Sequence, residues 1–165
     1  MTSNLIWATT KAVAAAGNYT IGDVISESAT VGTPWIWTFP QDIKRILKAI
    51  LVVETASQTH SCSLLLFRSD PRKWATPPML NDNVANTAPL NAHYSELVGV
   101  IDFPNLRGLG TGASFSVATP GSFGNLPEEV GLEPSTGKLY GILIDNTGHT
   151  DEGAGDDYNI GLVVE

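Results

Sequence analysis

Short apolar runs alternate with spacers rich in Gly, Pro, Asn and Ser from Asp23 to the last residue of the chain. No long segment has the 3.6-residue periodicity of an amphipathic helix. Apolar runs of this length between turn residues predict β-strands. We expect eight of them, over residues 23–28, 33–40, 50–53, 61–67, 96–103, 113–118, 138–144 and 158–165.

About eight short strands with two long loops predict an all-β fold, a jelly-roll-like or Greek-key β-sandwich. We assign residues 23–165 to a single β-sandwich domain and residues 1–22 to an N-terminal arm. The arm begins with the apolar triplet Leu5-Ile6-Trp7 and continues with small residues. A stretch this apolar is expected to pack against its own domain or against a neighbouring subunit.

Two segments have a less regular pattern. Residues 41–55 predict a turn or irregular piece that leads into the strand at 50–53, with 61–67 as its hairpin partner. Residues 69–94 contain four prolines and no apolar periodicity, which predicts a long loop. Loops of that length are usually functional or ordered by a partner, so Trp74 is a candidate contact residue.

Composition and charge restrict the possible partners. The chain of 165 residues is long enough to form one domain with a sizeable core. Its net charge of −8 comes from residues 128–165, which argues against binding to nucleic acid. No apolar stretch approaches the length of a membrane span and no basic leader is present, so we expect synthesis in the cytoplasm and no membrane partner.

The sequence contains little that is typical of catalytic or metal sites. The single cysteine, Cys62, lies in an apolar run and predicts a buried, inert thiol. His60, His93 and His149 lie far apart, without the spacing of zinc ligands. No nucleophile elbow or dinucleotide-binding pattern is present, and no acidic residues pair across a predicted cleft. We therefore expect neither enzymatic activity nor a cofactor or metal.

Two features allow more than one interpretation. The acidic segment 145–157 is dense in oxygen ligands but matches no calcium-loop spacing, so it is either an Asx-rich turn or a cation site. Trp35 and Trp37 lie on one face of a predicted strand. They could fill the core, form a subunit interface or stack on sugar rings.

Several segments, in one order over residues 23–164, resemble small structural proteins of tailed bacteriophage particles. The segments that carry the resemblance are Trp35-Ile36-Trp37-Thr38-Phe39, Leu64-Leu65-Leu66-Phe67-Arg68-Ser69-Asp70-Pro71, the Asn/Asp-rich loop that follows, Val100-Ile101-Asp102-Phe103-Pro104 and Leu139-Tyr140-Gly141-Ile142-Leu143. The family is that of the capsid decoration (cement) proteins.

This resemblance implies a virion protein that binds the outer surface of the capsid. Such proteins commonly form trimers, bridge neighbouring major capsid proteins and stabilise the shell. Leu5, Ile6, Trp7 and Trp74 are then the candidate contacts with the capsid or with another subunit. A tail, baseplate or head-fibre protein and a carbohydrate-binding module are the alternatives.

Overall fold

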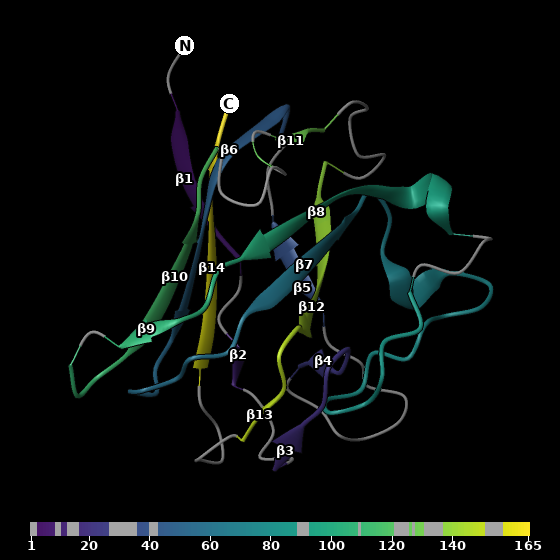
Figure 1. Cartoon of the computed structure of the whole chain (residues 1–165). Helices are drawn as coiled ribbons and strands as arrows, with labels where there is room; N and C mark the ends of the chain where they lie inside the picture. Colours follow the sequence, from purple (N-terminus) through teal and green to yellow (C-terminus); the bar gives the residue numbers. More distant parts are fainter. Residues whose placement is uncertain are drawn as a thin grey trace.

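The computed structural model confirms an all-β, antiparallel sandwich (Figure 1). The finer jelly-roll or Greek-key topology stays a prediction. The structure describes residues 3–8, 11–12, 17–26, 36–39, 43–88, 93–108, 110–120, 126, 128–130, 137–150 and 157–165. Trp35 lies outside these residues. Within them, no helix is long and apolar enough to span a membrane.

The larger sheet has seven strands and joins both ends of the chain. Its main order is β1-β14-β6-β10-β9, with β11 paired to β6 and β2 paired to β14. The strand bounds are β1 Asn4–Trp7, β2 Lys11–Ala12, β6 Arg45–Val53, β9 Arg107–Gly108, β10 Ser114–Ala118, β11 Glu128–Glu129 and β14 Asp157–Val164. Strand β14 lies between β1 and β6, so the first described strand is held in place by the last one (Figure 1).

The smaller sheet has five strands in the main order β4-β12-β7-β8, with β5 also paired to β12. Its strands are β4 Val24–Ile25, β5 Trp37–Phe39, β7 Cys62–Phe67, β8 Leu97–Phe103 and β12 Leu139–Asp145. A separate two-stranded ribbon pairs β3, Asn18–Tyr19, with β13, His149–Thr150. Two short 3₁₀ helices, η1 (Pro71–Lys73) and η2 (Tyr94–Glu96), complete the described elements.

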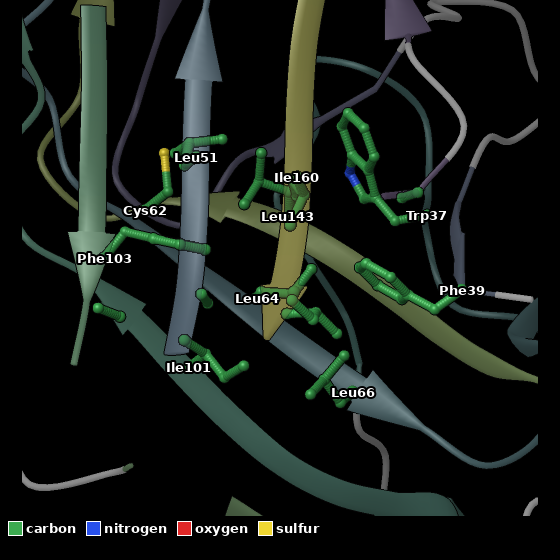
Figure 2. Packing of buried hydrophobic residues seen from close by; sticks show 14 of the residues in the cluster. Trp37, Phe39, Leu51, Cys62, Leu64, Leu66, Ile101, Phe103, Leu143 and Ile160 are labelled. Carbon is green, nitrogen blue, oxygen red and sulfur yellow. The ribbon is translucent and has the colours of Figure 1, made fainter. Parts of the chain in front are cut away.

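The main hydrophobic core lies between the two sheets (Figure 2). Leu51 and Ile160 of the larger sheet belong to the same buried cluster as Leu64 and Leu143 of the smaller one. Alternate residues of each strand point inward, as expected for sheets packed face to face. Side chains are packed tightly within the smaller sheet around β12, because a Cβ added at Gly141 would lie 2.7 Å from the Cδ1 atom of Leu64 on the neighbouring β7.

A second buried hydrophobic cluster covers the side of the smaller sheet that points away from the main core. Leu80 of the long loop belongs to this cluster together with Phe67 and Tyr140, and Trp74 packs against it. All six residues of β7 are therefore buried, which explains why its sequence is continuously apolar instead of alternating. The sequence predicts that the loop 69–94 is functional or ordered by a partner, whereas Trp74, Leu80 and Ala88 of this loop pack on the chain's own sheet.

Two sequence-based expectations about the middle of the chain are wrong. Strand β6 begins at Arg45, five residues before the expected start at Ile50. The early start was missed because a β-bulge opposite Val163 and Val164 interrupts the alternation of buried and exposed residues. Segments 50–53 and 61–67 do not form a hairpin. Strand β6 pairs with β14 and β10 in one sheet, whereas β7 pairs with β12 and β8 in the other.

Candidate functional site

The three candidate contact residues of the N-terminal segment lie on β1, at the edge of the larger sheet. Leu5 and Trp7 are 49% and 45% exposed, whereas Ile6 between them is 6% exposed and belongs to the main core. This alternation follows from the period of two of a strand. Ile6 therefore packs inward, and only Leu5 and Trp7 present their side chains to a neighbour.

Leu5 and Trp7 are part of a larger apolar surface, which we call the outer face. It lies on the side of the larger sheet that points away from the core, and its other members are partly exposed. The outer face consists of Leu5, Trp7, Ile50, Val52, Phe115, Val117 and Val163. The solvent side of an antiparallel sheet is usually polar, so an apolar outer face is typical of a binding surface.

The pairing register makes the outer face continuous across four strands. Leu5 lies beside Val163, and Trp7 lies beside Gly161, which in turn pairs with Ile50. Ile50 pairs with Val117 of β10. In the next row, Val52 pairs with Phe115. Cross-strand neighbours of this kind are in side-chain contact.

The Trp7 indole packs directly on the backbone of Gly161. A Cβ at position 161 would lie 3.0 Å from two carbon atoms of the indole, closer than ordinary van der Waals contact. The ring therefore rests on the backbone of β14, a position that any side chain at 161 would disturb. This contact holds Trp7 in one orientation while nearly half of it stays exposed.

Charged residues of both signs border the outer face. Glu54 and Asp157, which are joined by a backbone hydrogen bond, lie at one end of it. Two basic residues lie at its sides. Lys48 pairs with Val163 on one side, and Arg107 pairs with Phe115 on the other. A hollow of about 170 Å³ lies next to Phe115 and is also lined by Pro104 and Asn105. The face therefore combines an apolar centre, a hollow and charged neighbours of both signs.

The fourth candidate, Trp74, lies away from the other three. Its ring meets Phe67 edge-on at 5.1 Å and lies 4.2 Å from the His93 ring. Its indole N–H donates to Ser69 Oγ at 2.7 Å. These contacts attach the long loop to the outer side of the smaller sheet, so the structure does not bring Trp74 together with Leu5 and Trp7.

Trp37 is 1% exposed and lies in the main core. It cannot stack on a sugar ring, because its faces are covered by the two sheets. Of the interpretations left open for Trp35 and Trp37, the core is correct for Trp37.

Sequence reasoning missed a polar cluster at the end of the sandwich, where β7 begins and β12 ends. The His60 and His149 rings are stacked at 3.7 Å between centroids, and Tyr19 stacks on the other side of His149 at 4.6 Å. His149 Nδ1 is hydrogen-bonded to Asp145 Oδ2. Tyr158 Oη lies 3.2 Å from His60 Nε2 and 3.4 Å from His149 Nε2. The cluster borders a pocket of about 320 Å³.

The geometry of the stacked rings is unsuited to metal binding. The two rings lie in separate planes that are parallel to within 9°, so no nearby position lies in the plane of both rings, where an ion bound by both would have to lie. Among the described residues, no three or more His, Cys, Asp or Glu side chains form a group that could hold a metal. Asp145 accepts hydrogen bonds from the N–H groups of Thr147 and Gly148, as in an Asx turn. Residues 151–156 of the acidic segment lie outside the described residues.

A second hydrogen-bond chain runs along the neighbouring strand ends. Asn146 Nδ2 donates to Ser63 Oγ at 2.7 Å, and Ser63 Oγ donates to Asp102 Oδ1. A serine nucleophile needs a base that removes its proton, usually a histidine. In the part of the chain that the structure describes, no histidine is hydrogen-bonded to Ser63.

Asp82 anchors the long loop near the same end. Tyr19 Oη and the Ser26 N–H both donate to its Oδ1 atom, at 2.7 and 2.9 Å. Burial raises the pKa of Asp82 to about 6, although these hydrogen bonds partly oppose the shift. Asp82 therefore has a structural role, and burying its ionised form lowers the free energy of unfolding.

This raised pKa predicts a pH-dependent difference between the protein and its Asp82→Asn variant. Because the folded-state pKa lies above the unfolded value of 3.8, protonated Asp82 stabilises the fold below about pH 4. That contribution is lost as the pH rises through 6. The stability of the protein minus that of the variant should fall by about 1–2 kcal/mol between pH 4 and 7, allowing for solvent screening.

Urea unfolding of both chains at several pH values measures this difference. Other titrating groups are common to both chains, and the Asn Oδ1 atom keeps the acceptor that Tyr19 and Ser26 use. A difference that stays constant from pH 4 to 7 would contradict the prediction.

No protein-family model matches the sequence, and no curated protein or solved structure matches the chain significantly.

Proposed function

We propose that the chain is a capsid decoration protein of a tailed bacteriophage, a structural protein that binds the outer surface of the head. It bridges neighbouring major capsid proteins and thereby stabilises the shell, and it does so as a homo-oligomer, most simply a trimer. The observation that carries the proposal is the outer face, an apolar surface across the larger sheet that includes Leu5 and Trp7. The sequence resemblance supplies the identity of the partner.

The outer face is suited to binding because its residues are already ordered. Leu5 and Trp7 are fixed by the pairing of β1 with β14, and the Trp7 indole rests on Gly161. A partner therefore gains buried apolar area, about 25 cal/mol for each Å², without having to order a flexible segment. Tryptophan is over-represented among the residues that contribute most to binding energy.

The charges around the outer face indicate the chemistry of the partner surface. Lys48 and Arg107 lie beside the apolar centre. A complementary surface has an apolar patch with carboxylates at its border, because opposite charges favour association and orient the partner.

The proposal predicts that Trp7→Ala weakens attachment to the capsid while the fold remains intact. We expect the apparent Kd for undecorated phage heads to rise about 30-fold, equivalent to about 2 kcal/mol. The free energy of unfolding should change by less than about 1 kcal/mol, since Trp7 is half exposed. Co-sedimentation with heads measures binding, and light scattering on the purified protein gives the oligomeric state.

Tyr94→Ala is the matched control, because Tyr94 is an aromatic residue that is 69% exposed but lies on η2, outside the outer face. It should bind heads like the unaltered protein. Normal binding by Trp7→Ala would show that the outer face is not the capsid contact. If the unaltered protein ignores heads, the decoration role fails. The same assay with tails and baseplates then tests the alternative virion roles.

A further inference from the structure

We propose that the stacked His60–His149 pair is an acid-sensitive latch that fastens the β3–β13 ribbon to the sandwich. The closed stack accommodates at most one proton beyond its two neutral imidazoles. Uptake of a second proton separates the rings and opens this end of the molecule, while the core between the two sheets stays folded.

The first support is the position of the two rings. They are stacked face to face with 3.7 Å between centroids, and the His60 residue is 3% exposed. Two positive charges so close together repel strongly where water cannot screen them. A neutral ring beside a charged one carries no such penalty, so the stack tolerates a single charge.

The second support is the hydrogen-bond pattern. The Asp145 carboxylate and the Gln58 Oε1 atom can only accept hydrogen bonds, so the Nδ1 atoms of His149 and His60 that face them carry hydrogens. Both Nε2 atoms face Tyr158 Oη, whose one O–H can donate to only one of them. One added proton on the other Nε2 completes the chain, because that N–H then donates to the Tyr158 oxygen.

The third support is the set of titratable groups around the two rings. The titratable groups that face it in the described residues are Asp145 at the end of β12, Tyr158 on β14 and Tyr19 on β3. Cys62 of β7 and Asp82 of the long loop lie behind these. Burial raises the pKa of the Cys62 thiol well above its usual value, which keeps the thiol neutral.

Asp145 is the carboxylate in direct contact with the pair, and its negative charge offsets the positive charge that one added proton brings. Burial alone would raise its pKa, but hydrogen bonds from His149 and from the N–H groups of Thr147 and Gly148 lower it below the usual value. Burial, followed by the neighbouring His149, lowers the pKa of His60 to about 4 against the attraction of Asp145. A second proton therefore binds much better once the stack is open.

The element that the latch holds is paired over only two residues on each strand. The ribbon consists of the pairs His149–Tyr19 and Thr150–Asn18, with one further hydrogen bond from Thr150 Oγ1 to Asn18 Oδ1 at 2.8 Å. Apart from the ring stack, the ribbon is attached through Tyr19, which is 3% exposed and belongs to the main core cluster. Opening therefore has to withdraw Tyr19 from the edge of that cluster. Since Tyr19 also donates to Asp82, opening loosens one anchor of the long loop.

Hydrogen exchange of the whole protein between pH 7 and 4.5 tests the proposal. After correction for intrinsic rates, the opening constant of the β3 and β13 amides that are protected at pH 7 should rise up to about tenfold for each pH unit below 6.5, as for uptake of one proton. Amides of β6 and β14 should show no such rise. No rise at the ribbon, or an equal rise in β6, would overturn the latch.

His60→Gln should make ribbon opening nearly independent of pH, because glutamine does not titrate. His93→Gln is the control: the His93 ring lies 4.2 Å from the Trp74 ring, away from the pair, and this variant should keep the pH dependence of the unaltered protein. A His60→Gln variant that keeps the full pH dependence would overturn the proposal.

An NMR titration of the unaltered protein decides the question even if His60→Gln does not fold. The imidazole signals should show no more than one protonation of the pair before the ribbon opens. Two independent protonations near pH 6.5 in a closed ribbon would overturn the latch.

Discussion

A chain that ends at Asp157, and so lacks residues 158–165, should have no cooperative folding transition. Strand β14 pairs with both β1 and β6 and carries four buried side chains: Tyr158, Ile160, Leu162 and Val164. Burial of such side chains contributes about 1.5–3 kcal/mol each. Their combined contribution of about 6–12 kcal/mol is as large as the net stability of a typical domain.

Thermal unfolding followed by circular dichroism measures this effect, and one-dimensional NMR shows whether methyl signals remain dispersed. A chain without Thr2 and Ser3 is the control, because its deletion ends before β1 begins at Asn4. The control should unfold like the full-length chain. A truncated chain with a sharp transition near that of the full-length protein would show that β14 is dispensable.

Replacing Trp37 by alanine should lower the free energy of unfolding by about 3–5 kcal/mol, the usual cost of removing a large buried aromatic side chain. Trp37 is among the largest fully buried side chains, and it packs with both sheets in the main core. The tight packing around Gly141, whose added Cβ would lie 3.3 Å from Trp37 Cβ, limits collapse into the cavity.

Urea unfolding of Trp37→Ala and Trp7→Ala side by side gives the clearest measurement. The two variants remove the same side chain from the core and from the outer face, so their difference isolates the effect of burial. We expect Trp7→Ala to cost less than about 1 kcal/mol. A Trp37→Ala cost as small as that of Trp7→Ala would place Trp37 outside the core.

The sequence predicted the five strands of the smaller sheet and three strands of the larger one, β6, β10 and β14, but none of the other short strands. The strands of the larger sheet that were found have one face inward. Segments 113–118 and 158–165 show the alternation that this produces, and they correspond to β10 and β14. Strand β7 is buried on both faces, so its apolar run contains no information about its neighbours. The incorrect hairpin with β6 followed from assuming that strands close in sequence are paired.

The candidate site was only partly predictable. The residues of β1 were found because an apolar triplet near the start of a chain is conspicuous. Ile50 and Phe115 were missed, since a strand pattern does not reveal which of its two faces meets the core. The pairing of Asp145 with Cys62 brings the segment after β12 next to the one before β7. His149 and His60 meet for this reason, which no local spacing could indicate.

The position of β14 between β1 and β6 also affects synthesis of the protein. During translation, β1 emerges first but has no partner until residues 157–164 have left the ribosome. The larger sheet therefore cannot close until β14 has emerged, and β1 and β14 meet in a contact between segments about 150 residues apart in the sequence. Until then, the apolar side chains of β1 are exposed on the nascent chain, where they are open to chaperones and to aggregation.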